Sequence, residues 1–166
     1  MKEDSTEQCP SDIEYAIDAC GDAVLRLATC RLRNKADAED VFQTVFLKLF
    51  QRNAEFSSTE HLKAWLLRVT LNCCTDLHRS SWVQTRAPLN EVRDAKEEVP
   101  DQSPPFLQEA LDRLPEKQRV AIHLFYFEGY STEETARLMH ENPATTRSHL
   151  CRARKTLKIT LGGSDE

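Results

Sequence analysis

The feature that most constrains this chain is a pair of short helix signals near its C-terminal end. Ser131 and Glu134 have the spacing of a capping box, in which the hydroxyl and the carboxylate each satisfy a backbone amide of the first helical turn. Asn142 and Pro143 mark a second start, because asparagine caps a helix and proline loses no hydrogen bond at the first helical position. We therefore expect two helices joined by a turn. They cover residues 132–139 and 143–157.

The second of these helices has two chemically different faces. At about 100° per residue, one stripe can pack on the first helix, and it holds Thr146, Leu150, Ala153 and Leu157. The opposite face is small and basic, with Ala144, Ser148, Cys151, Arg152, Lys155 and Lys158, flanked by Arg147 and Arg154. Such a face on the second helix of a helix-turn-helix has the shape that enters a DNA major groove. The alternative is an ordinary surface helix, because the helix dipole favours lysine and arginine near the C-terminal end.

Composition limits the chain to a few classes of protein. Its 166 residues suffice for one or two domains, and 40% apolar and 30% charged residues are ordinary for a soluble globular chain. No apolar run is long enough for a membrane span, and the acidic N-terminal stretch lacks the apolar core of a signal peptide. We therefore expect a cytoplasmic protein without membrane insertion. The net charge of −5 argues against a free-standing DNA binder and favours a partner that brings the chain to DNA.

The six cysteines are scattered and show no C-x-x-C spacing: Cys9, Cys20, Cys30, Cys73, Cys74 and Cys151. In a reducing compartment we expect thiols, several of them buried as small apolar residues. The spacing supports no zinc site, so we expect neither a metal nor a cofactor. A cysteine-dependent enzyme that uses Cys73 or Cys74 is an alternative, but no glycine-rich oxyanion turn accompanies them.

The N-terminal half shows apolar residues at the 3–4 spacing of amphipathic helices. Gly21-Asp22 either breaks the first of these stretches into two helices or lies within one. Asp37 is the expected N-cap of the second. The stretches are residues 12–33, 38–51 and 60–79, and the polar loop 52–60 separates the last two.

The helix expected over residues 38–51 has an unusually wide apolar arc. Phe46, Leu47 and Phe50 extend the arc beyond the stripe that one neighbouring helix would cover. The helix therefore needs a second packing surface, which is either another helix of the same domain or a protein partner.

Residues 83–105 differ in composition from the stretches on either side. They hold four of the seven prolines, and residues 91–101 carry five acids against two bases. This composition predicts a flexible linker between a domain of residues 12–82 and a domain of residues 106–161. The second domain would begin at Ser103-Pro104, and its central packing helix would be Lys117–Glu128. The expected fold is all-α, with two small helical domains joined by a flexible linker, the C-terminal one with a helix-turn-helix.

Two blocks of this sequence resemble a known family, the bacterial RNA polymerase sigma factors of the sigma-70 family. Region 4 of that family is similar to LPEKQRVAIHLFYFEGYSTEETARLM and the following TTRSHLCRARKTLK. Region 2 is similar to DAEDVFQTVFLKLFQR and HLKAWLLRVTLNCCTDLHR. The linker leaves no room for a region 3 domain, as in the extracytoplasmic-function (ECF) subgroup. The resemblance implies a sigma factor that directs core polymerase to specific promoters and helps to open them. It is not itself an enzyme, because polymerase does the chemistry.

The resemblance also implies partners and the residues that meet them. The partners are the β′ clamp and β flap of core polymerase, promoter DNA and, in many family members, an anti-sigma factor. The positions that contact the β′ clamp are Asp40, Gln43, Thr44 and Leu47, with Thr44 where an acid is common. The positions on the DNA side of region 2 are Asn72, which reads unpaired −10 bases, Arg68 and Arg79, with the loop Asn53–Glu60 holding a flipped base. The positions that meet the −35 element are Arg147, Ser148, His149, Arg152 and Lys155.

Some residues of the helix-turn-helix depart from the family pattern. Thr135, Glu141 and Thr146 take positions that are usually apolar, which predicts a looser core. His149 replaces a frequent arginine. An alternative function is a transcription regulator that binds DNA through the helix-turn-helix without polymerase. The block around Asp40 and Gln43 argues against it, because a simple repressor needs no such block.

Overall fold

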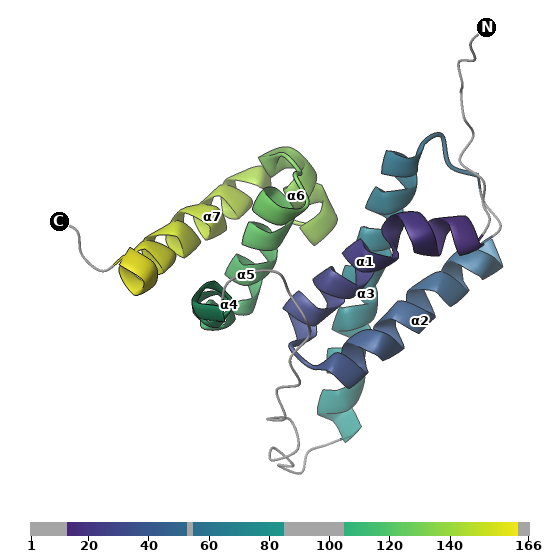
Figure 1. Cartoon of the computed structure of the whole chain (residues 1–166), viewed down its shortest axis with the longest axis horizontal. Coiled ribbons are helices and arrows are strands. Elements are labelled where there is room, and N and C mark those ends of the chain that lie inside the picture. Colours follow the sequence, from purple (N-terminus) through teal and green to yellow (C-terminus); the bar gives the residue numbers. More distant parts are fainter. Residues whose placement is uncertain (1–12, 53–54, 85–104, 163–166) are drawn as a thin grey trace, which may run out of the picture. The chain divides into compact units, whose positions relative to one another are not determined.

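The computed structural model describes residues 13–52, 55–84 and 105–162, and helices make up almost all of these ranges (Figure 1). The helices divide into two compact units, α1 to α3 and α4 to α7, each with its own buried residues. The expected all-α class with two small helical domains is thus confirmed. Residues 85–104, which hold most of the expected linker and its cap at Ser103-Pro104, lie outside the described residues.

The first helix, α1, is continuous over Ile13–Leu32. Gly21 does not break it. This glycine is buried, and a Cβ at its position would lie 3.5 Å from the side chains of Ile17 and Phe42. The glycine signal therefore marks a place where α1 approaches the next helix closely rather than a helix end.

The second helix, α2, covers Lys35–Arg52 and begins three residues before the expected range. Its N-cap is Asn34, whose Oδ1 accepts the Asp37 N–H at 2.9 Å. The expectation that Asp37 caps this helix was wrong, because an acid in the first turn is favoured by the helix dipole and resembles a cap in sequence. The buried stripe is Ala38, Val41, Val45, Phe46 and Leu49.

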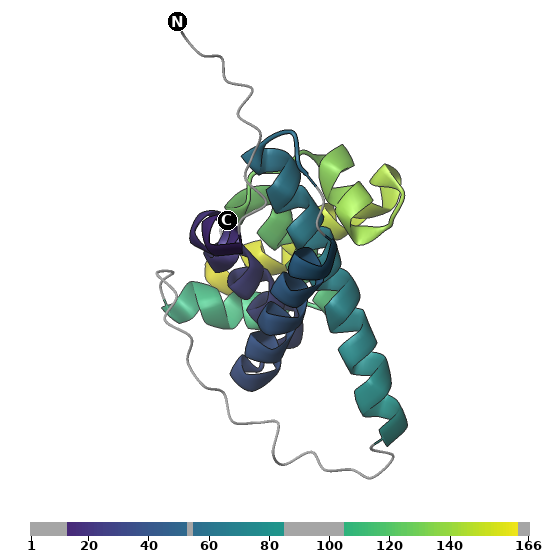
Figure 2. The ribbon, with the colours of Figure 1, turned by 90° about the vertical axis from the view of Figure 1, so that its right-hand side faces the viewer.

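The third helix, α3, covers Thr59–Gln84 and packs against both α1 and α2. Ser58 precedes it and its Oγ accepts the His61 N–H at 3.0 Å, as an N-cap does. Figure 2 shows that the last turns of α3 diverge from α1 and α2. The sequence predicted that this helix ends at residue 79, so α3 continues five residues past its expected end. It includes residues 83–84, which composition assigned to the linker.

The second unit begins with α4, Pro105–Asp112, and α5, Glu116–Ile122. The α-helix expected over Lys117–Glu128 ends early, because His123–Phe127 form a π-helical turn. In this turn the Glu128 N–H bonds to the carbonyl of His123, five residues back, at 3.0 Å. The wider turn leaves Tyr126 and Phe127 exposed, although the sequence placed them in the central packing helix.

The last two helices match the sequence expectation residue for residue. They are α6, Thr132–Met139, and α7, Pro143–Leu157. The capping box is present: the Ser131 N–H donates to Glu134 Oε1 at 2.9 Å, and the Glu134 N–H donates to Ser131 Oγ at 3.1 Å. The core of this unit consists of Leu111, Leu114, Ala121, Ile122, Leu150 and Ala153.

Candidate functional site

The basic face of α7 is presented to solvent, as the sequence predicted. Asn142 caps the helix through a 3.0 Å bond from the Ala144 N–H. Thr146, Leu150 and Ala153 are buried against the rest of the unit. The opposite side is exposed and carries Arg147, Ser148, Cys151, Arg152 and Lys155. The structure thus gives α7 a continuous polar and basic surface of the kind that fits a major groove.

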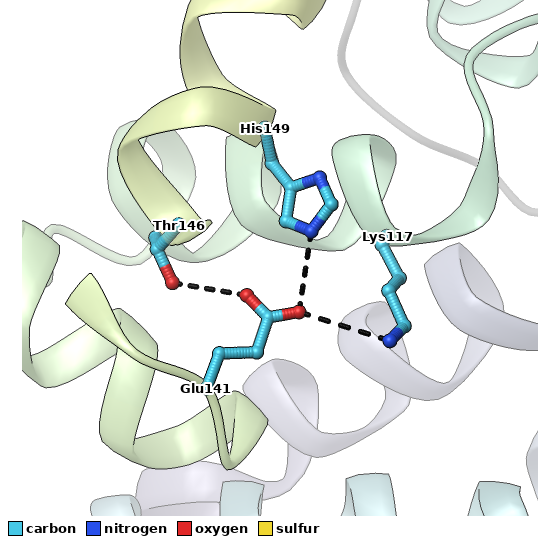
Figure 3. A network of polar contacts seen from close by, with 4 residues as sticks. All are labelled: Lys117, Glu141, Thr146 and His149. Atoms are coloured by element: carbon cyan, nitrogen blue, oxygen red, sulfur yellow. Dashed lines mark hydrogen bonds and ion pairs between the residues drawn. The ribbon is translucent and has the colours of Figure 1, made fainter. Parts of the chain in front are cut away.

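His149 lies apart from these exposed residues. Its side chain is only 17% exposed, and its Nε2 is 3.3 Å from Oε2 of Glu141 in the preceding turn (Figure 3). The family resemblance placed His149 among the positions that meet the −35 element, and a linear pattern does not show which way the ring turns. A DNA contact from His149 stays a prediction, and it would require the ring to leave this carboxylate.

The unusually polar positions of the helix-turn-helix are buried. Thr135 and Thr146 are fully buried, and the Thr146 hydroxyl donates to Glu141 Oε1 at 3.0 Å. Among the described residues, Thr135 Oγ1 and Glu141 Oε2 have no hydrogen-bond partner, so the looser core at these positions stays a prediction.

The outer face of α3 presents the region 2 positions expected to meet DNA. Arg68, Asn72 and Arg79 are all exposed, while Leu67, Leu71 and Cys74 on the other side are buried. The three exposed residues follow one another at helical spacing along this face. The structure therefore brings the guanidinium groups and the amide onto one side of a single helix, where they can meet one strand of DNA.

The segment that leads into α3 is fixed by aromatic contacts that the sequence did not reveal. Arg52, at the end of α2, stacks over Trp65 with its Cζ 5.0 Å from the ring centroid. Phe56 is buried, and its ring centroid lies 5.7 Å from that of Trp65. The Ser57 N–H donates to His61 Nδ1 at 3.3 Å. Residues 53–54 of the expected base-holding loop lie outside the described residues, but these contacts fix both ends of the loop.

The positions expected to bind polymerase form one exposed stripe on α2. Asp40, Gln43, Thr44 and Leu47 are all exposed and follow the i, i+3, i+4, i+7 spacing of a single helix face. Leu47 and Phe50 are 56% and 69% exposed, whereas Phe46 is buried. The wide apolar arc is therefore covered only in part by neighbouring helices, which leaves an apolar stripe for a partner.

The second unit has an open apolar groove of about 500 Å³ that the sequence did not predict. Its walls come from α4, the end of α5, the π-helical turn at His123–Phe127, the end of α7 and a second π-helical turn at Lys158–Gly162. Arg154 lines the groove, and its Nε donates to the hydroxyl of Tyr126 at 2.7 Å. The apolar lining residues are Leu107, Leu111, Ile122, Tyr126, Phe127, Leu157 and Leu161. A π-helical turn has no clear sequence signature, so only the surplus of aromatic residues near position 126 hinted at this surface.

Cys73 and Cys74 lie in surroundings that do not favour a reactive thiolate. Cys73 and Cys74 are buried, and desolvation raises the pKa of the Cys73 thiol above its ordinary value of 9.0. A thiol that resists ionisation is a poor nucleophile, which argues against the cysteine-enzyme alternative.

Within the described ranges, no cluster of three or more His, Cys, Asp or Glu side chains could hold a metal ion. Among the helices that the structure describes, none is both long and apolar enough to cross a membrane.

Comparison with known proteins assigns both units. Residues 16–83 match the family of Sigma-70 region 2, and residues 107–157 match that of Sigma-70, region 4. The ECF RNA polymerase sigma factor SigM of Mycobacterium tuberculosis is 32% identical over 138 residues, which cover 82% of this chain and 70% of SigM. This chain belongs to the ECF RNA polymerase sigma factors. An ECF sigma factor acts with RNA polymerase at specific promoters, so the chain functions in transcription initiation.

Other ECF sigma factors agree with this assignment. The RNA polymerase sigma-E factor of Streptomyces coelicolor is 30% identical over 148 residues, covering 87% of this chain and 82% of that protein. Among solved structures, sigma factor RpoE from Bartonella quintana, in complex with the anti-sigma factor NepR, has a TM-score of 0.73 at 25% identity. That alignment covers 94% of this chain and all of RpoE.

Proposed function

We propose that this ECF sigma factor works through three separate exposed helix faces. The stripe on α2 binds the β′ clamp of polymerase, the outer face of α3 captures the opened −10 strand, and the basic face of α7 enters the major groove at the −35 element. The observation that carries this proposal is the exposure of all three faces on helices whose opposite sides are buried core. Each face can therefore bind a partner without disturbing the fold.

On α2, polar and apolar groups combine in a way that suits a protein partner. Asp40 and Gln43 can form hydrogen bonds or ion pairs, while Leu47 and Phe50 bury apolar surface. Helical anchors at i, i+3, i+4 and i+7 are the usual pattern by which one helix docks on another protein. Thr44 donates its hydroxyl to the backbone carbonyl of Asp40 at 2.9 Å, so it adds little to this contact.

On α3, a short amide between two arginines suits a single strand of DNA. Arg68 and Arg79 can neutralise phosphates, and Asn72 can form hydrogen bonds with the edge of an unpaired base. On α7, Arg147, Arg152 and Lys155 supply phosphate or base contacts, and Ser148 lies between them at the centre of the face.

The β flap is the partner that fits the apolar groove of the second unit. The groove is open, and its lining includes Arg154 and Lys158 but none of the exposed residues Arg147, Ser148, Arg152 and Lys155. An amphipathic helix of the flap could lie in it with its apolar side buried. The region 4 domain could then hold polymerase and DNA at the same time.

The remaining parts of the proposal follow from family membership. We place the region 2 domain at residues 12–82 and the region 4 domain at residues 106–161, with residues 83–105 between them, of which α3 includes the first two. The chain acts in the cytoplasm, where it serves polymerase as a specificity subunit and performs no catalysis itself. Because RpoE is held by the anti-sigma factor NepR, an anti-sigma factor is also a fitting partner for this chain.

The α2 stripe is tested by combining Asp40→Ala with Gln43→Ala. Both side chains are exposed, so the fold should be retained, while the retention of core polymerase on the immobilised chain should fall about tenfold or more, because two polar contacts are lost. Asp18→Ala removes an exposed acid from α1 and serves as the matched control. Unchanged retention of polymerase by the double variant would show that α2 does not make this contact.

A further inference from the structure

The turn of the helix-turn-helix contains a nearly buried carboxylate. His140, in the left-handed region with φ 59°, ends α6, and the Glu141 N–H then donates to the carbonyl of Ala136 at 2.8 Å. The side chain of Glu141 is 8% exposed. The backbone of the turn thus aims this carboxylate into the protein, at a position that the sequence had singled out as unusually polar.

The carboxylate of Glu141 joins three elements of the domain (Figure 3). Its Oε1 accepts the hydroxyl of Thr146, in the first turn of α7, at 3.0 Å. Its Oε2 lies 3.3 Å from Nε2 of His149, one turn further along α7. The Nζ of Lys117, in the first turn of α5, lies 4.0 Å from the same oxygen. The side chain of Glu141 therefore links the turn, α7 and α5.

The two side chains near Oε2 are not equal partners. Lys117 is 69% exposed, and an ion pair at 4.0 Å from a solvated ammonium contributes little. His149 is largely buried and lies closer. Within the described residues, Oε2 accepts no hydrogen bond of good geometry, so it depends on the charge of these neighbours. Moving the imidazole away would leave a buried carboxylate oxygen without its nearest partner, which is unfavourable.

This arrangement separates His149 from its neighbours in sequence. Arg147, Ser148 and Arg152 are exposed on the basic face of α7, while the ring of His149 is turned toward the carboxylate. We propose that Glu141 is a positioning residue for promoter recognition, which holds His149 against the turn so that α7 contacts DNA without it. The inference rests on the proposed function of α7, and it assigns a role to a residue that does not itself touch DNA.

The test is a double-mutant cycle on promoter affinity, with the full chain bound to core polymerase. The DNA is a promoter duplex selected by the wild-type holoenzyme from a library randomised in its −35 element. The four proteins are the wild type, His149→Ala, Glu141→Gln and the double variant, each measured over a range of salt concentrations. Glu141→Gln keeps an oxygen for the Thr146 hydroxyl but removes the charge that attracts the imidazole.

In the wild-type background, His149→Ala should change promoter affinity by less than about twofold, because the ring does not reach DNA. In the Glu141→Gln background the ring is free to meet DNA, so the same change should lower the affinity about three- to tenfold. Equal losses in both backgrounds, or no loss in either, would overturn the proposal.

Two further proteins keep the outcome interpretable. Glu141→Asp shortens the side chain by one methylene, so it withdraws the carboxylate from His149 without removing its charge. It should release the ring as Glu141→Gln does, and it replaces that variant in the cycle if Glu141→Gln fails to fold. Arg152→Ala tests the proposed function separately: it should weaken promoter binding in the wild-type background, and if it has no effect, α7 is not the DNA-binding helix.

Discussion

At the scale of single residues, the proposed DNA contacts come from exposed side chains, and the nearly buried carboxylate of Glu141 lies behind those of α7. The exposure of Asn72, Arg147 and Arg152 follows from helical periodicity alone. The contact between Glu141 and His149 does not, because it depends on how the turn between two helices folds back. Residues eight apart in sequence meet here only because Glu141 lies in the turn before α7.

Asn72 offers a residue-scale prediction that separates function from stability. Because Asn72 is exposed on α3, Asn72→Ala should change the free energy of unfolding by no more than about 0.5 kcal/mol. If its amide holds an unpaired −10 base, the same change should reduce permanganate reactivity of the open promoter several-fold while polymerase binding stays intact. Asp76→Ala, at another exposed position of α3, is the control. Wild-type reactivity in the Asn72→Ala protein would exclude this role.

Cys73 provides a prediction about pH. Burial raises the pKa of its thiol above 9.0; the nearby Lys48 ammonium opposes this shift, and the Asp76 carboxylate adds to it. The thiol ionises at a lower pH when the chain unfolds, so this group's contribution to stability is complete below the unfolded pKa and is lost as pH rises through the folded pKa, which lies above 9.0.

The measurement compares wild type with Cys73→Ala in urea unfolding at pH 7 and at pH 9.5. The wild type should lose more stability between these two pH values than the variant does, since other titrating groups are common to both proteins. At pH 8, iodoacetamide should modify the exposed Cys151 well before Cys73. Equal pH dependence in the two proteins would show that Cys73 is not desolvated.

At the scale of secondary-structure elements, the sequence predicted the helix ends that local capping residues mark. It did not predict features that no local residue marks. Both helices of the helix-turn-helix were predicted to the residue, because their caps lie within the same few positions of sequence. The end of α3 and the π-helical turn at His123–Phe127 were missed. Polar residues after position 79 do not stop a helix, and a run that is apolar on most sides does not show where an extra residue enters a turn.

Gly21 is the element-scale position whose replacement should stabilise the protein. A helical glycine costs about 0.5–1 kcal/mol relative to alanine. The Cβ of alanine would lie 3.5 Å from Ile17 and Phe42, which is ordinary van der Waals contact. Gly21→Ala should therefore raise the free energy of unfolding of the N-terminal unit by up to about 1 kcal/mol. Ala19→Gly, at an exposed site on the same helix, should lower this free energy of unfolding. A destabilised Gly21→Ala protein would mean that α1 and α2 pack too closely at Gly21 to admit a Cβ.

At the scale of the whole molecule, composition predicted the division into two units, because the proline-rich acidic stretch interrupts the helical pattern. Each unit is small, and each leaves apolar residues exposed: Leu47 and Phe50 on α2, and the groove beside α7. These surfaces explain why an acidic chain can act at promoters. A large partner can cover both surfaces and hold α3 and α7, the two helices proposed to meet DNA, on one scaffold.

Dependence on polymerase is therefore the central claim. The free chain has a net charge of −5, and the few Lys and Arg on α7 release few counterions from DNA. When one scaffold holds both units, the second contact with DNA becomes intramolecular, which can raise avidity about 10²–10⁴-fold. The free chain and the holoenzyme should therefore differ in their affinity for the same DNA.

The most direct test measures binding and run-off transcription on one selected promoter duplex, with the chain alone and with core polymerase added. We expect faint, salt-sensitive binding by the free chain, and specific open complexes and transcripts only with core polymerase. Combining Asp40→Ala with Gln43→Ala should reduce polymerase binding and transcription together. Tight, sequence-specific binding by the free chain, unaffected by these two changes and followed by no transcript when core polymerase is added, would contradict the account.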